Sequence, residues 1–193
     1  MERRRAVQLL GGALSAPLAT SSEALAELLT FGARVRASVP ADQAPSDLLT
    51  PTRARALEAM AEIVIPRTDT PGAEAAGVTE FVTALVDGWL DDAEREPFLA
   101  GLDDVDVQAV DRFGAVFAEC SDEERSIMIA EFDDDLTRRR SEGRASGHFF
   151  HGVKRFTLTA YFTSEAGLAA LGHRIAVRRF EGCAPLSNPE GCP

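Results

Sequence analysis

Two histidines are the residues in this chain whose type and spacing best suit metal chemistry. His148 and His151 are three residues apart, so a helix would place both side chains on one face. His173 would add a third imidazole nitrogen, and a catalytic zinc site uses three protein ligands. The alternative is that these histidines make local hydrogen bonds at a helix start or face solvent. A free-standing metal-binding enzyme using His148, His151 and His173 is therefore one hypothesis, although the spacing identifies no carboxylate to support it.

Carboxylates cluster at Glu131 and at Asp133, Asp134 and Asp135. A calcium-binding EF-hand spreads its oxygen ligands over about 12 residues around a central glycine, and that spacing is absent here. We therefore interpret the cluster as a solvated helix end. The sequence also has no glycine-rich phosphate loop after a strand and no Gly-x-Ser-x-Gly elbow. It predicts no catalytic residue, and no metal site or cofactor in this chain outside the histidine hypothesis.

Helices must position these residues, because apolar side chains recur at three- and four-residue steps along most of the chain. Thr50 followed by Pro51 is typical of a helix start, and Ser121 with Glu124 is a capping box. No alternating strand pattern of useful length is present. The sequence predicts an all-α fold, a single compact helical domain over residues 20–193. Its expected helices cover about residues 22–39, 51–65, 78–90, 105–119, 122–136 and 149–161.

The N-terminal residues 1–19 have the pattern of a targeting segment. Arg3, Arg4 and Arg5 form a basic region, and a short, weakly apolar stretch with Gly11 and Gly12 follows. That stretch is too short for a membrane span, which needs about 20 residues. Paired arginines before such a stretch are typical of a twin-arginine export signal. The alternative is a frayed helical start with a basic cap.

The net charge limits the classes of partner. The 193 residues contain 20 Lys and Arg against 31 Asp and Glu, a formal charge of −11. A nucleic-acid-binding protein would present a basic face, and a protein held on anionic lipid would carry basic clusters. The three N-terminal arginines make the remaining chain still more acidic than the total. The composition therefore excludes both classes and favours a partner with basic or neutral patches.

The cysteines fit an exported protein. Cys183 and Cys192 flank a tail segment rich in proline and glycine, and a disulfide between them would close a short loop. The alternative is two free thiols. Cys120 is then unpaired, either as a small buried residue or as a thiol that bridges to another chain.

Several segments together resemble the gluconate 2-dehydrogenase subunit 3 family, over nearly the whole chain. The start, residues 2–11, is similar to the family's twin-arginine segment. The strongest likenesses are an Ile-Pro followed by Thr-x-Thr-Pro-Gly-Ala and a later Tyr-x-Thr-Ser-Glu-x-Gly. In this chain they span Ile65–Ala73 and Tyr161–Gly167, and Phe162 and Phe180 stand where the family has tyrosines. Phe98–Leu102 and Phe180–Cys183 fit further family segments.

The resemblance implies a partner subunit and no active site of its own. Family members are small accessory subunits that pair with a large FAD-containing dehydrogenase subunit of the glucose-methanol-choline type, often together with a cytochrome c subunit. They are thought to carry the export signal for the folded complex, so the twin-arginine translocation machinery and a periplasmic location are implied. The alternative is a chaperone that releases its client after export.

We expect the partner-binding surface to be helical and to contain aromatic side chains. Aromatic residues are dense beside a polar block near the end of the expected last helix. The predicted contact residues are Phe149, Phe150, Tyr161, Phe162, Thr163, Ser164 and Glu165. The alternative for the phenylalanines is that helical spacing places them in the core.

Overall fold

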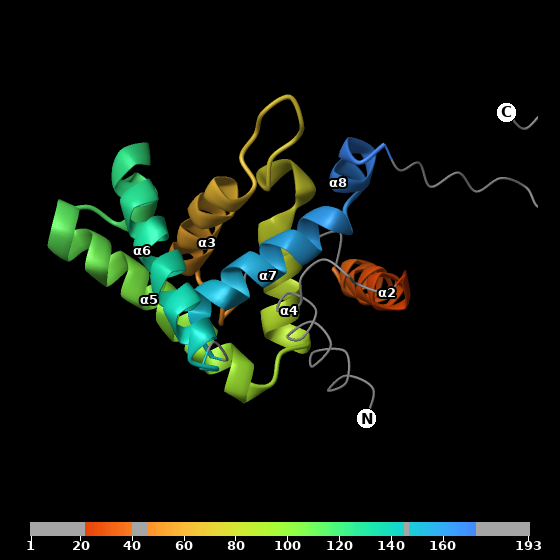
Figure 1. Ribbon diagram of the computed structural model, residues 1–193, viewed down its shortest axis with the longest axis horizontal. Coiled ribbons are helices and arrows are strands. Elements are labelled where there is room, and N and C mark those ends of the chain that lie inside the picture. The colour runs from red at the N-terminus through yellow and green to blue at the C-terminus, as the bar shows by residue number, and fades with distance from the viewer. Residues whose placement is uncertain (1–21, 40–45, 145–146, 173–193) are drawn as a thin grey trace, which may run out of the picture.

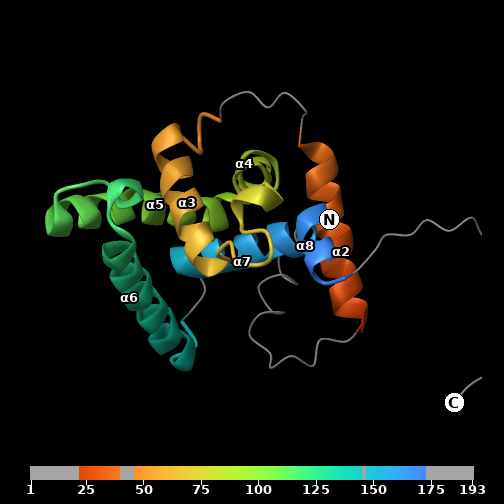
Figure 2. The same ribbon diagram turned by 90° about the horizontal axis from the view of Figure 1, so that it is seen from above.

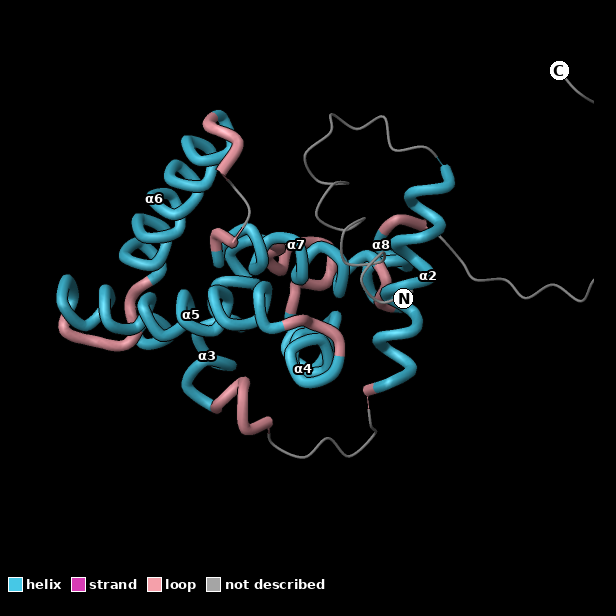
Figure 3. Tube along the Cα trace, turned by 90° about the horizontal axis from the view of Figure 1, so that it is seen from below, coloured by secondary structure: helices cyan, strands magenta, loops and turns pink. Residues whose placement is uncertain are grey.

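The computed structural model describes residues 22–39, 46–144 and 147–172. All regular structure in this part of the chain is helical, with short loops between helices (Figure 3). This confirms the predicted all-α fold for the described residues. None of their helices is long and apolar enough to cross a membrane. The predicted signal residues 1–19, His173, Cys183 and Cys192 lie outside the described residues.

The helix α7 (Phe149–Phe162) lies at the centre and packs against every other α-helix of the described residues (Figures 1 and 2). Two helices, α5 and α6, pack towards its N-terminal end, while α2 and α8 lie at the other end (Figure 2). The remaining elements are α2 (Ser22–Ser38), α3 (Pro51–Val64), η1 (Glu74–Ala76), α4 (Val78–Gly88), α5 (Asp92–Phe113), η2 (Phe117–Glu119), α6 (Asp122–Ser141) and α8 (Glu165–Ala170).

Apolar stripes of these helices face α7 and form one core. From α7 itself, Val153, Phe156 and Ala160 are buried, at spacings of three and four residues that keep them on one side of the helix. Phe81 of α4 and Leu57 of α3 are fully buried opposite them. The core therefore runs the length of α7, and each end of this helix is fixed against different neighbours.

Two helix starts follow the predicted caps. The Thr50 hydroxyl accepts a hydrogen bond from the Arg53 N–H at the start of α3. Ser121 and Glu124 form the predicted capping box at the start of α6, each side chain accepting the other residue's backbone N–H. These caps satisfy backbone N–H groups that have no partner inside the helix.

The predicted helix over 105–119 is wrong at both ends. The observed helix, α5, begins at Asp92, because the Asp91 carboxylate caps it by accepting the Glu94 N–H. It ends at Phe113, and a separate 3₁₀ turn, η2, follows. Asp91 is thus the exposed N-cap of α5, the longest of the described helices.

Candidate functional site

The two segments with the strongest family resemblance meet in space although they are far apart in sequence. The Tyr161 hydroxyl, at the end of α7, donates a hydrogen bond of 2.9 Å to the Pro71 carbonyl in the loop between α3 and η1. The short helix α8 packs against η1 on the same side. Figure 1 shows this loop rising between α3 and α4, close to α8. The two strongest likenesses therefore lie at one place in the structure, at the C-terminal end of α7.

The turn from α7 into α8 is shaped by its own side chains. The Ser164 hydroxyl accepts the Gly167 N–H at 2.9 Å and donates to the Tyr161 carbonyl at 2.7 Å. Position 167 must be glycine, because a Cβ there would lie 2.1 Å from the Tyr161 carbonyl oxygen. Thr163 donates its hydroxyl to the Thr159 carbonyl at 2.7 Å. The Thr-Ser part of the motif thus builds the turn.

The loop opposite is also held in one shape. Its two ends are joined by the Ala73 N–H, which donates to the Ile65 carbonyl at 3.0 Å. The Glu62 carboxylate accepts the Glu74 N–H at 2.7 Å. These bonds hold the two ends of the loop together, and the bond from Tyr161 holds the loop at Pro71. The loop is therefore ordered by contacts that leave its outer side uncovered.

The outer side forms a surface that we call the motif surface. Its apolar contribution from the end of α7 is Phe162, which is 36% exposed and packs edge-on against the buried Tyr161 ring at 5.3 Å. Exposed carboxylates belong to the same turn and loop. The motif surface is defined here by the exposed residues Asp69, Pro71, Glu74, Phe162 and Glu165.

The predicted contact residues separate into exposed and buried groups. Phe150, Tyr161 and Ser164 are 1%, 5% and 4% exposed, so their side chains belong to the core and not to an available surface. Phe162 and Glu165 are exposed and Thr163 is half-buried. Phe149 is half-buried at the other end of α7, about 20 Å away along a helix of this length. The predicted set therefore does not form one surface.

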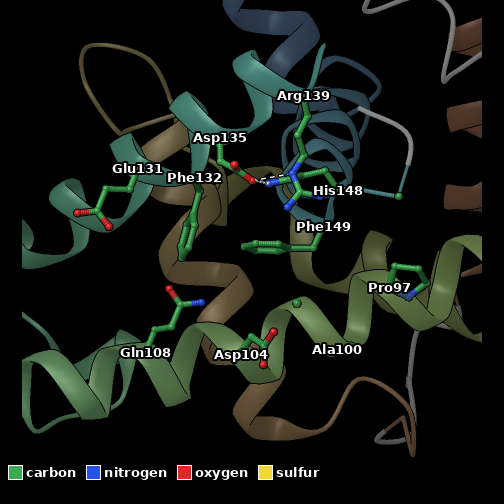
Figure 4. Close-up of a pocket in the computed structure, with 12 residues that line it drawn as sticks. Pro97, Ala100, Asp104, Gln108, Glu131, Phe132, Asp135, Arg139, His148 and Phe149 are labelled. Atoms are coloured by element: carbon green, nitrogen blue, oxygen red, sulfur yellow. Dashed lines mark hydrogen bonds and ion pairs between the residues drawn. The ribbon is translucent and has the colours of Figure 1, made fainter. Parts of the chain in front are cut away.

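Phe149 instead lines a cleft of about 440 Å³ between α5, α6 and the start of α7 (Figure 4). Its ring packs edge-on against Phe132 at 5.1 Å and is stacked with the His148 ring at 5.5 Å. Asp104 and Gln108 of α5 and Glu131 of α6 line the same cleft (Figure 4). Glu131 is held in a two-bond ion pair by Arg112, which lowers the pKa of Glu131.

His148 in this cleft is fully used by local hydrogen bonds. Its Nδ1 accepts the Phe150 N–H at 3.2 Å, which makes His148 the N-cap of α7. Its Nε2 lies 3.1 Å from an Asp135 carboxylate oxygen, and Asp135 is also paired with Arg138 and Arg139. Burial lowers the pKa of His148, although the Asp135 hydrogen bond opposes that shift. This is the local hydrogen-bonding alternative considered for the two histidines.

His151 has surroundings unlike those of a metal ligand. Burial lowers its pKa to about 4, and the positive charges of Arg155, Arg140 and Lys154 add to the shift. Across the described ranges, no group of three or more His, Cys, Asp or Glu side chains is placed to hold a metal ion. The structure therefore brings together no metal site from His148 and His151.

Cys120 is buried at the end of η2, with its thiol directed at the Ala115 and Val116 carbonyls. Burial raises the pKa of this thiol, and the nearby Glu124 charge adds to the effect. These surroundings fit the small buried residue and give no access for a bridge to another chain.

One of the comparisons with known proteins covers the residues that form the motif surface. A model of the gluconate 2-dehydrogenase subunit 3 family matches residues 51–174. The chain therefore belongs to the gluconate 2-dehydrogenase subunit 3 family, and it is an accessory subunit of a dehydrogenase complex with dehydrogenase partner subunits. No curated protein and no solved structure matches the chain.

Proposed function

We propose that this chain is a non-catalytic small subunit that binds a large FAD-dependent sugar dehydrogenase subunit of the glucose-methanol-choline type and stabilises it. The observation that carries the proposal is the motif surface: family-like segments from both halves of the domain fold together and hold Phe162 outwards. A contact surface whose shape is already fixed loses little conformational entropy when a partner binds. The internal bonds of the loop and the turn supply such a surface.

The chemistry of the motif surface also specifies what the partner must present. Phe162 offers an aromatic ring, and aromatic anchors in an apolar pocket commonly dominate interface energetics. In the described loop and turn, the exposed carboxylates of Asp69, Glu74 and Glu165 outnumber the exposed guanidinium of Arg67. The partner subunit should therefore offer an apolar pocket for the ring, with basic residues at its edge.

Binding is tested by co-expressing this chain with the large subunit and measuring the affinity of the purified pair. Phe162→Ser should weaken binding at least about tenfold, because truncating an aromatic anchor costs at least about 2 kcal/mol and each 1.4 kcal/mol is a factor of about ten. Val107→Ser is the matched control, since Val107 is 59% exposed on α5, outside the motif surface. Equal affinity of the Phe162→Ser variant and the wild type would remove the motif surface from the proposal.

The N-terminal arginines support an export role for the same subunit. FAD is inserted in the cytoplasm, so the large subunit must cross the membrane folded, and a twin-arginine signal directs folded cargo. We propose that residues 1–19 carry both chains to the periplasm, where a cytochrome c subunit accepts electrons. Replacing Arg3 and Arg4 with lysine should leave both chains in the cytoplasm. Undiminished export of the large subunit would contradict this part.

A transient chaperone is distinguished from a permanent subunit by the composition of the mature enzyme. A permanent subunit predicts that the dehydrogenase purified from the periplasm contains this chain in equimolar amount. Mass spectrometry of that preparation, with the intact mass of this chain, measures the ratio and shows whether residues 1–19 are removed. A mature enzyme that lacks this chain would favour the chaperone.

A further inference from the structure

The helix α2 lies outside residues 51–174, the segment that matches the family, yet it is part of the folded core. Val35 is fully buried and Phe31 is 6% exposed. The Phe31 ring packs edge-on against Trp89 after α4, at 5.5 Å, and the Trp89 indole N–H donates to the Ser38 hydroxyl at 3.3 Å. In Figures 1 and 2, α2 lies across the end of α7, next to α8. The helix nearest the N-terminal segment is thus docked behind the motif surface.

Arg36 is the residue of α2 that reaches the backbone next to both motif segments, three residues after the first and one residue before the second. Its guanidinium donates to the Ala76 carbonyl at the end of η1, at 3.0 Å, and to the Ala160 carbonyl in the last turn of α7. Carbonyls in a last helical turn lack partners within the helix, and the negative end of the helix dipole favours a cation there. The same group lies over the Phe81 ring, 5.3 Å from its centre. Arg36 therefore ties together the backbone beneath both halves of the motif surface.

The fit of α2 depends on a second close contact with the same turn. A Cβ at Gly32 would lie 2.2 Å from the Thr163 Cγ2 atom, so the two helices approach closely at this point. The Arg36 Nε also lies 3.4 Å from the Thr163 hydroxyl oxygen. Two residues of α2, one turn apart, thus contact the residue that follows Phe162.

We propose that α2 supports the motif surface: docked through Arg36 and the close contact at Gly32, it fixes the loop and the α7–α8 turn. Docking of α2 and binding of the partner then strengthen each other. Such coupling is reciprocal, because the affinity gained by the partner when α2 is docked equals the gain in α2 docking when the partner is bound. Arg36 is in this sense a positioning residue for the binding surface. The partner half of the statement rests on the proposed function.

Amide hydrogen exchange on the full-length chain tests the first half without a partner. Arg36→Met should raise exchange in the loop over 66–76 and in the turn over 160–167, as well as in α2. Gly32→Ala should give the same pattern, since it displaces α2 while keeping the arginine. Arg34→Met is the matched control, because Arg34 is an exposed arginine on the same helix.

Arg36→Lys should restore part of the protection from exchange, since lysine donates from one point and lacks the guanidinium fork. Faster exchange confined to α2 would overturn the proposal.

Affinity for the large subunit tests the second half. Arg36→Met should weaken binding about 5- to 150-fold, the usual range of coupling between two sites, and Arg34→Met should leave it unchanged. If the wild-type chain binds the large subunit and Arg36→Met binds it with the same affinity, the proposed coupling is wrong. If the wild-type chain does not bind the large subunit, the proposed function is wrong. The hydrogen-exchange pattern then decides by itself whether α2 fixes the conformation of the loop and the turn.

Discussion

The Tyr161 hydroxyl donates to the Pro71 carbonyl at 2.9 Å and so joins two segments that are 90 residues apart in the chain. Tyr161 itself is 5% exposed, so the bond is made at the edge of the core, directly beneath the exposed loop. A tyrosine whose ring is buried and whose hydroxyl donates a hydrogen bond to a loop stabilises the core and also fixes the position of the loop. The loop conformation on which the motif surface depends is therefore linked to the stability of the core.

Tyr161→Phe should destabilise the domain by about 1 kcal/mol, the net contribution of a typical hydrogen bond, because the ring keeps its packing while the bond to Pro71 is lost. Urea unfolding of both chains measures the difference. Phe162→Tyr is the control, since it adds a hydroxyl to an exposed ring and should change stability by less than about 0.5 kcal/mol. An unchanged midpoint for Tyr161→Phe would mean that the loop is held without this bond.

Gly167→Ala and Gly88→Ala should have opposite effects. A Cβ at 167 would lie 2.1 Å from a backbone oxygen, so the α7–α8 turn must shift, at a cost of about 1–3 kcal/mol. A Cβ at 88, at the end of α4, has nothing within 4 Å, and alanine there should stabilise the helix by about 0.5 kcal/mol. Thermal unfolding of the two variants checks the sign of each effect. A stable Gly167→Ala chain would show that the turn is more adaptable than its contacts indicate.

His151 should make the folded protein less stable as the pH falls below neutrality. Its pKa is lowered to about 4, chiefly by burial and then by Arg155, against 6.5 for the ordinary side chain. Between these values the unfolded chain binds more protons than the folded one, so stability decreases as the pH falls from about 6.5 towards 4. Urea midpoints at pH 7 and pH 5 should differ more in the wild type than in His151→Gln. Equal differences would assign the acid sensitivity to other groups.

Glu94→Gln should be strongly destabilising, because it leaves the Arg155 guanidinium buried without its anion. The Arg155 side chain is 6% exposed and its Nη2 lies 3.1 Å from a Glu94 oxygen. The Glu94 side chain is 29% exposed, so the loss should lie between the about 3 kcal/mol for breaking a fully buried pair and the about 1 kcal/mol or less that an exposed pair contributes. Asp103→Asn, which breaks the exposed pair with Arg53, is the matched control. Similar losses in the two variants would contradict the difference in burial.

Local signals in the sequence were sufficient for most helix starts. Thr50 and Ser121 cap their helices as predicted, because a capping side chain bonds within three residues of itself. The start of α5 was missed although its cap, Asp91, is equally local. The predicted start near residue 105 lies well inside the observed helix, which also contains Pro97, a residue that normally interrupts a helix interior.

The candidate site was predictable only in part. Phe149, Phe150 and Phe162 are all aromatic residues on one helix, and their exposure depends on which neighbours cover each face. Those neighbours come from distant parts of the chain, so burial of Phe150 and exposure of Phe162 could not be separated from spacing alone. Arg36 was missed for a similar reason: its partners are the backbone carbonyls of Ala76 and Ala160, which have no sequence signature.

The docking of α2 also has a consequence for the choice of fragments to express. A fragment that begins at residue 51 would contain the whole family-matched segment. It would lack Phe31, Val35 and Arg36, and would turn the Phe81 and Trp89 rings towards water. Uncovered aromatic faces of this kind promote aggregation. A fragment with the boundaries of the family match would therefore tend to aggregate, whereas a fragment that includes α2 keeps these rings covered.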